Sequence, residues 1–184
     1  MEAVGDGVAQ DSVIGTNHGE EIMERSDGVL VVVPCGRRKV WQRSPDRGPA
    51  PAAEAYTGAP FVVNRAYADR FGDAWVILSA KYGFVPPDFE IPVPYEVTFD
   101  RITPEVVSMT RLREQVAEQR LDRFTVVVGL GGKTYRAVVE AAFAGPASTL
   151  VFPFAGLPIG TAMRAVNRAV ASGEPGFEAR EGIA

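Results

Sequence analysis

The 184-residue chain has almost none of the two residue types that carry most metal and nucleophile chemistry, since it contains one cysteine, Cys35, and one histidine, His18. A single cysteine excludes an internal disulfide framework and an all-cysteine metal site. A Ser-His-Asp triad, a two-histidine zinc site or a His-Cys nucleophile pair would each depend on His18, which lies in a polar stretch. Acid–base chemistry is therefore expected from Asp, Glu, Lys, Tyr or Cys side chains, with no metal and no cofactor.

Long apolar runs are also missing. A run such as Val29–Pro34 is far shorter than the about 20 apolar residues that cross a bilayer, and the N-terminus has neither the basic start nor the apolar stretch of a signal peptide. The 46% of hydrophobic residues is nevertheless enough for a sizeable buried core. The short apolar runs and the N-terminus favour a cytoplasmic protein with no membrane partner. The length favours a single domain, because domains usually run to about 100–200 residues.

The net charge of −4 hides an asymmetry along the chain. Residues 1–27 hold seven acidic residues against Arg25 alone, so this segment carries a charge of −6 and the remainder carries +2. Because the segment is polar and has no apolar periodicity, we predict a disordered acidic leader over residues 1–27. We also expect residues 173–184 to form a flexible tail.

Basic residues concentrate in a predicted loop over residues 35–55, directly after the first apolar run. Within this loop only Asp46 and Glu54 are acidic, and the basic residues are Arg37, Arg38, Lys39, Arg43 and Arg47. Such a cluster suits phosphate or a nucleic-acid backbone. A solvated surface loop is the alternative interpretation.

Apolar stretches and helical spacing alternate along the chain. Continuous apolar runs, typical of strands buried on both faces, occur at residues 29–33, 74–78, 125–128 and 149–152. Helices are predicted over residues 58–71, 103–121, 133–143 and 161–171, the second beginning at Thr103-Pro104 as cap and first helical residue. A long, proline-rich loop is predicted over residues 80–102. This order predicts an α/β fold over residues 28–172: a three-layer sandwich with a mainly parallel four-stranded sheet.

In such sheets, ligands bind outside the carboxyl ends of the strands. Four distinctive segments follow the predicted strands, at residues 34–39, 79–83, 129–135 and 156–160. We expect all four to converge on one rim. In particular, Arg37, Lys81 and Lys133 should line a common pocket with room for a phosphorylated sugar and a planar ring.

The first of these segments combines a tight turn, a thiol and three cations. Gly36 lets a ligand approach the backbone, and Arg37 can clamp phosphate oxygens with two hydrogen bonds. Arg38 and Lys39 add positive charge. Cys35 is a candidate nucleophile or ligand contact, although a lone cysteine after a buried strand more often packs as a small apolar residue.

In the segment that follows the second strand, Ser79, Lys81 and Tyr82 are candidates to contact a ligand. Lys81 can hold a phosphate or form a Schiff base, and Tyr82, like Tyr56, can stack on a flat base. The alternative is a structural turn with Tyr82 packed beneath it.

The third segment is a glycine-rich turn from a strand into a helix. The free amides of Gly129, Gly131 and Gly132 would attract an anion at the helix N-terminus. Lys133 and Tyr135, in the first helical turn, are expected to face the ligand.

Few carboxylates are expected on this rim. Hydrolysis at an N-glycosidic carbon needs a carboxylate to steady developing positive charge or to polarise water, and it needs neither histidine nor metal. We predict Glu54 or Asp100 in this role, with Lys81 as a further catalytic candidate. A cap or a surface charge is the ordinary alternative for each carboxylate.

Several of these motifs resemble a small family of bacterial and phage proteins. Its members typically read Ser-Cys-Gly-Lys-Lys-Lys, then Leu-Tyr-Thr-Gly, then Leu-Ser-Ala-Lys-Tyr-Gly-Leu. The resemblance spans about residues 29–170. The matching stretches here are Cys35–Lys39, Ala55–Gly58 with Phe61 and Arg65, Leu78–Val85, Pro94-Tyr95 with Thr98, and Gly132-Lys133 with Tyr135.

That family is distantly similar to the uracil-DNA-glycosylase-like domain of archaeosine tRNA-guanine transglycosylases, and more faintly to the peroxide-stress YaaA proteins, which bind DNA. The resemblance implies a base-handling α/β domain that acts on nucleotides or nucleic acid.

Three functional hypotheses follow. The first is an N-glycosidase-type enzyme that cleaves or exchanges a base–sugar bond in DNA or in a phosphorylated nucleoside. The second is a non-catalytic module that binds nucleic acid or a nucleotide with the same rim. The third is an enzyme of small-molecule nucleoside metabolism, whose affinity would depend only weakly on salt.

Overall fold

The computed structural model describes residues 26–145 and 148–178. Most of the predicted acidic leader, residues 1–25, lies outside these residues, as do residues 179–184 of the predicted tail. The leader was predicted to end at Asp27, but strand β1 (Ser26–Pro34) already begins at Ser26.

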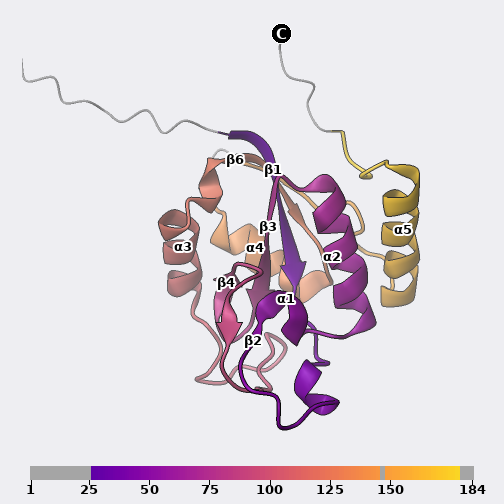
Figure 1. Cartoon of the computed structure of the whole chain (residues 1–184). Helices are drawn as coiled ribbons and strands as arrows, with labels where there is room; N and C mark the ends of the chain where they lie inside the picture. Colours follow the sequence, from indigo (N-terminus) through magenta and orange to yellow (C-terminus); the bar gives the residue numbers. More distant parts are fainter. Residues whose placement is uncertain (1–25, 146–147, 179–184) are drawn as a thin grey trace, which may run out of the picture.

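A five-stranded sheet forms the middle layer of the fold (Figure 1). Its order is β4-β3-β1-β6-β7, with β3, β1, β6 and β7 parallel and β4 antiparallel to β3 at one edge. The α/β class is confirmed, but the sheet has five strands instead of the predicted four. The strands flanking β1 are β3 (Ala74–Ser79), β4 (Gly83–Val85), β6 (Phe124–Gly129) and β7 (Thr149–Val151).

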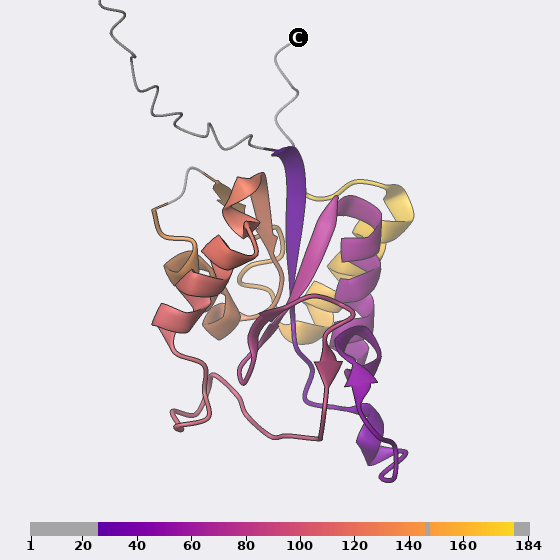
Figure 2. The ribbon, with the colours of Figure 1, turned by 60° about the vertical axis from the view of Figure 1, so that its left-hand side comes forward.

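Helices cover both faces of the sheet, with α2 and α5 on one face and α3 and α4 on the other (Figure 2). The alternation of β1 explains this arrangement, because Val31 and Val33 pack toward α2 and α5 while Leu30 and Val32 pack toward the other face. Each of these four side chains is at most 1% exposed. The helices are α2 (Ala59–Phe71), α3 (Met109–Glu118), α4 (Lys133–Ala142) and α5 (Ile159–Ser172).

Helix α3 begins later than Thr103, where the sequence predicted it. Its cap is Ser108, whose Oγ accepts a hydrogen bond from the Arg111 amide at 3.1 Å. Upstream of it, the Val107 amide donates to the Ala80 carbonyl at 2.9 Å. This tertiary hydrogen bond takes the amide out of any helix, so the Thr103-Pro104 pair forms only a turn.

Short elements organise the two predicted loops. The basic loop contains a 3-10 turn (Val40–Gln42), β2 (Ala50–Pro51) and α1 (Ala52–Ala55), and β2 pairs with β5 (Glu90–Ile91) in the long loop. A second 3-10 turn, Leu121–Arg123, leads into β6. The two loops therefore support one another through a small antiparallel pair.

The first part of the predicted flexible tail is packed against the domain. The Tyr67 hydroxyl donates to the Pro175 carbonyl at 2.6 Å, and Phe177 packs on the core beside α2 and α5. Gly173 ends α5 in the left-handed conformation, with φ of +79°. Residues 173–178 therefore include contacts with the domain.

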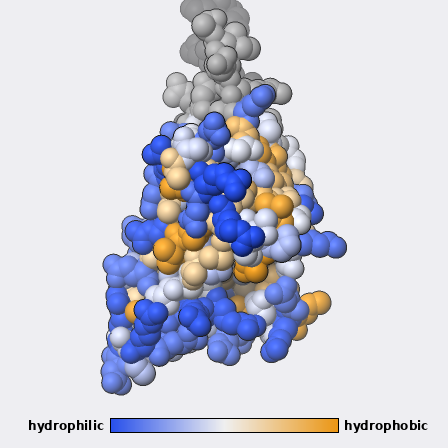
Figure 3. Space-filling view, turned by 90° about the vertical axis from the view of Figure 1, so that its right-hand side faces the viewer, coloured by the Kyte–Doolittle hydropathy of each residue, from blue (hydrophilic) through white to orange (hydrophobic). Residues whose placement is uncertain are grey.

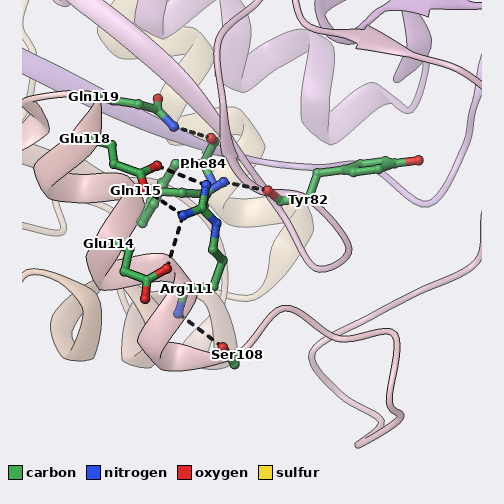
Figure 4. A network of polar contacts seen from close by, with 8 residues as sticks. All are labelled: Tyr82, Phe84, Ser108, Arg111, Glu114, Gln115, Glu118 and Gln119. Atoms are coloured by element: carbon green, nitrogen blue, oxygen red, sulfur yellow. Dashed lines mark hydrogen bonds and ion pairs between the residues drawn. The ribbon is translucent and has the colours of Figure 1, made fainter.

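The outer edge of β4 is satisfied by side chains of α3 instead of by another strand (Figure 4). Gln115 accepts from the Phe84 amide at 2.9 Å and donates to the Tyr82 carbonyl at 2.9 Å, while Gln119 donates to the Phe84 carbonyl at 2.8 Å. Exposed strand edges invite pairing with other chains. The two glutamines thus close this edge of the sheet.

We expect Gln115→Met to destabilise the fold by about 2–4 kcal/mol, because it leaves the Phe84 amide and the Tyr82 carbonyl without partners. Gln115→Glu keeps an acceptor for the Phe84 amide but turns a carboxyl oxygen toward the Tyr82 carbonyl, so it should also destabilise the fold, and less so at low pH, where the carboxyl can be protonated and donate. Urea unfolding followed by circular dichroism measures both. Equal stability of the methionine variant and the parent would show that these hydrogen bonds contribute nothing net.

Candidate functional site

A cleft of about 1380 Å³ lies beyond the carboxyl ends of β1 and β6. The arrowhead of β1 in Figure 1 points toward this end of the sheet, at the lower end of the view. Residues from three of the four predicted strand-end segments, 34–39, 129–135 and 156–160, line it, whereas none from 79–83 does. The N-terminal turn of α2 and the loop over residues 96–103 complete its walls. The rule that locates ligands at strand ends therefore predicted the position of this cleft.

Three helices begin at the cleft. The cap residues of α2, α4 and α5 are Gly58, Gly132 and Pro158, and all three line it. None of them makes a side-chain capping hydrogen bond. The first amides of each helix have no intrahelical partner, and the helix dipoles place partial positive charge at the same ends. Their convergence would favour an anion in the cleft.

The glycine-rich turn leaves the start of α4 open. Gly131 has a φ of +107°, and a Cβ atom there would lie 3.0 Å from Cγ of Pro34. A Cβ atom at Gly132 would meet nothing within 4 Å. The turn thus needs glycine at position 131 for its backbone, while the space above Gly132 is free for a ligand.

Positive charge dominates the lining of the cleft. Five of its six basic side chains have no carboxylate within 4.0 Å among the described residues, and only Arg136 pairs, with Glu140 at 3.8 Å. The two acidic residues of the lining are Glu96 and Asp100. The five without a carboxylate partner are Arg37, Arg38, Lys39, Arg101 and Lys133. An anion in the cleft would therefore meet positive charge that the protein itself leaves uncompensated.

Backbone contacts hold the basic segment over the end of β1. The Cys35 amide donates to the Leu78 carbonyl at 3.0 Å, and the Arg38 carbonyl accepts from the Thr57 amide at 2.9 Å. Between these contacts, Arg37 is exposed at the mouth of the cleft. Its side chain is thus free to meet a ligand while its backbone is fixed.

Lys39, in contrast, is only 8% exposed. Its Nζ lies 4.4 Å from the centre of the Tyr95 ring and 3.5 Å from the Arg37 carbonyl, a long hydrogen bond. Burial lowers the pKa of Lys39 below its usual value, against smaller opposing effects of Cys35 and Glu96. Lys39 is thus buried, whereas the neighbouring Arg37 and Arg38 are exposed.

Hydroxyl and thiol groups lie together beneath the basic segment. Sγ of Cys35 lies 3.2 Å from the hydroxyl of Tyr135, whose pKa is raised, mainly by burial. Below them, the buried hydroxyls of Tyr56, Tyr95 and Ser79 form a hydrogen-bonded chain, with Ser79 to Tyr95 at 2.7 Å. Burial raises the pKa values of both tyrosines, so these phenols stay protonated at neutral pH.

Asp100 is the predicted carboxylate that lies at the cleft. Its Oδ1 accepts from Oγ1 of Thr134 in the first turn of α4 at 2.9 Å, and its Oδ2 accepts from Oγ1 of Thr98 at 3.3 Å. The neighbouring Phe99 packs edge-on against Tyr135, with ring centres 5.4 Å apart. These contacts tie the carboxylate to the helix terminus that would bind an anion.

The other two predicted catalytic residues do not line the cleft. Glu54 is exposed on α1 and pairs with Arg47 at 2.7 Å. Lys81 pairs with Glu105 at 3.5 Å. The predicted common pocket of Arg37, Lys81 and Lys133 is therefore wrong for Lys81, because the chain turns back into β4 after β3 and carries Lys81 away.

Four more residues that were predicted to contact a ligand lie outside the lining of the cleft, where they pack within the fold. Tyr56 is 2% exposed and Ser79 is fully buried. Tyr82 packs on Phe89 and Tyr95, as the structural alternative for its segment had it. At Gly129, a Cβ atom would lie 2.4 Å from the Phe152 ring, so this glycine makes room for a packed aromatic. None of these four residues lines the cleft.

Sequence reasoning missed the apolar wall of the cleft. Phe61 of α2, Phe154 and Leu157 before α5, and Met163 within it line this side. In Figure 3, which faces α5, apolar side chains gather over the middle of the molecule above a hydrophilic lower end. Helical spacing in residues 159–172 could have revealed an apolar face, but not that part of this face borders a cleft.

Among residues 26–145 and 148–178, no group of three or more His, Cys, Asp or Glu side chains is arranged to hold a metal ion. Within the same residues, every helix is too short or too polar to cross a membrane.

Fold and site together define a three-layer α/β domain with a basic cleft at the carboxyl ends of its parallel strands. The chain belongs to the "Family of unknown function (DUF6884)", whose profile matches residues 30–168. This range agrees with residues 29–170, over which the motifs resembled a small bacterial and phage family.

A relative in Bacillus subtilis (strain 168), "Uncharacterized protein YfjM", is 39% identical over 142 residues. The match covers 77% of this chain and 94% of that protein. No solved structure matches the chain significantly.

Proposed function

We propose that the cleft binds the phosphate of a nucleotide, free or within nucleic acid, and that the protein cleaves or exchanges the bond between base and sugar. The observation that carries this proposal is a convergence on a cleft that also holds Asp100. Three helix N-termini without side-chain caps meet there with five cations that have no carboxylate partner within the described part of the chain.

The size and walls of the cleft suit such a ligand. Its volume of about 1380 Å³ exceeds the about 300–1,000 Å³ of most small-molecule sites. The positive end would bind the phosphate, and the wall of Phe154 and Leu157 would accept the flat face of a base. The resemblance to uracil-DNA-glycosylase-like domains favours the same substrate class. A base within duplex DNA would first have to flip out of the stack, at a cost of a few kcal/mol.

Asp100 is the residue we assign to the chemistry. A carboxylate next to the glycosidic carbon would steady positive charge on the sugar or polarise the attacking water. Thr98 and Thr134 hold it in position. Glu96, also in the lining, is the second carboxylate available.

The test is base release from nucleoside 5′-monophosphates and from single- and double-stranded DNA, measured by liquid chromatography and mass spectrometry. We expect Asp100→Asn to lower the rate about 100-fold or more, because it keeps the shape and the acceptor for Thr134 but removes the charge. Glu54→Gln, outside the cleft, is the matched control and should leave the rate unchanged. If DNA binds but no base or abasic site appears, the non-catalytic binding hypothesis replaces the enzymatic one.

A further inference from the structure

Lys39 combines three features that rarely occur together in a lysine. Its side chain is only 8% exposed, and no carboxylate lies within 4.0 Å of it among the described residues. It also lines both the main cleft and a second cavity of about 410 Å³ that borders it. Lysines are almost never buried unless they are paired, because an unpaired ammonium loses its hydration at a large cost. A buried lysine at the boundary of two cavities therefore points to a role for its amine.

The surroundings of Lys39 act in both directions on its charge: burial favours the neutral amine, whereas the neighbouring aromatic rings favour the ammonium. Its Nζ lies over the Tyr95 ring, with the Tyr56 ring 5.9 Å away. Glu96 and the Cys35 thiol favour the charged form, but the effect of burial is larger, so the pKa of Lys39 is lowered. The phenols of Tyr56 and Tyr95 remain protonated and bring no negative charge.

We propose that Lys39 is an amine nucleophile that forms an imine with the aldehyde carbon of a phosphorylated sugar bound in the cleft. The inference rests on the proposed function, which places the phosphate at the helix N-termini. Loss of a base from a nucleotide leaves a sugar whose open-chain form carries such an aldehyde. Lys39 thus takes the Schiff-base role that the sequence assigned to Lys81.

The step is balanced without a further reactant. The Nζ lone pair attacks the carbonyl carbon, and the electron pair of the C–O π bond moves to oxygen, which takes up the proton that the nitrogen gives up. The resulting carbinolamine loses water to give the imine. Hydrolysis of the imine by water then returns the aldehyde and the free amine.

The chain offers a clean test because it contains only three lysines, Lys39, Lys81 and Lys133. The full chain is incubated with ribose 5-phosphate and sodium cyanoborohydride, which reduces an imine to a stable adduct, and peptide mass spectrometry locates the label. We expect at least a 10-fold excess of label on Lys39 over Lys81, which is salt-bridged outside the cleft, and over Lys133, which is exposed. Inorganic phosphate should compete, and ribose without phosphate should label weakly.

Lys39→Met and Lys39→Arg should both abolish the cleft adduct. The arginine variant keeps the positive charge, so it serves as the test if the methionine variant folds poorly. The labelling rate of Lys39 should level off at a lower pH than that of an ordinary lysine, because burial lowers its pKa. Equal label on the three lysines, or label that does not depend on the phosphate, would overturn the proposal. If nucleotides still bind and lose their base while no adduct is trapped, only the imine fails and the proposed function stands.

Discussion

Replacing Arg37 and Lys133 by alanine together is expected to weaken the binding of a nucleoside 5′-monophosphate about 100-fold. Both side chains are exposed in the lining of the cleft, and neither has a carboxylate within 4.0 Å among the described residues. Hydrogen bonds to charged groups contribute about 1.5–3 kcal/mol each, and exposure places these two near the lower value. Isothermal titration calorimetry measures the change directly.

The matched control is Lys81→Ala, which removes one positive charge outside the cleft and should change affinity less than 2-fold. The salt dependence of the affinity then distinguishes a mononucleotide from a nucleic acid as the ligand. A mononucleotide should show a shallow dependence of log affinity on log salt, whereas a nucleic acid should show a slope that grows by about 0.9 for each phosphate contact. If the double variant binds as tightly as the parent, the cleft is not the phosphate site.

The position of the cleft could be predicted because it follows from topology. Val29–Val33 and Thr125–Val128 are runs rich in β-branched residues, and such runs are typical of parallel strands buried on both faces. Once these strands are parallel, the segments after them must meet at one edge of the sheet. Arg37, Gly131 and Lys133 were therefore placed correctly without any knowledge of side-chain positions.

The parts that could not be predicted depend on contacts distant in sequence. Helix α3 was expected to begin at Thr103, but the hydrogen bond from Val107 to Ala80 delays it. The segment that contains Lys81 was predicted to begin a long loop over residues 80–102, whereas the chain turns into β4. Lys39 stands in a run of three cations, and only the fold shows that this one is buried beside Tyr95 while Arg37 and Arg38 are exposed.

The turn from β3 into β4 gives the prediction with the largest effect on stability. Gly83 has a φ of +76°, and a Cβ atom there would lie 1.9 Å from Oε1 of Gln115. Alanine would have to adopt the left-handed conformation, which costs about 1–3 kcal/mol. It would also displace the side-chain amide of Gln115, which hydrogen-bonds to the backbone amide of Phe84 and to the Tyr82 carbonyl. We therefore expect Gly83→Ala to lower the free energy of unfolding by about 3–5 kcal/mol, a large part of a typical total of about 5–15 kcal/mol.

Urea unfolding with Gly48→Ala as the control isolates the cause, because a Cβ atom at Gly48 meets nothing within 4 Å and its backbone is not left-handed. The control should change stability by less than about 1 kcal/mol. Combining Gly83→Ala with Gln115→Ala removes the clash, so the double variant should lose clearly less than the sum of the two single changes. Strict additivity would mean that the backbone of Gly83, and not its contact with Gln115, sets the cost. In that case the hydrogen bonds of Gln115 would close the edge of β4 independently of the turn, and the Lys81-Tyr82-Gly83 motif would be needed for its backbone conformation alone.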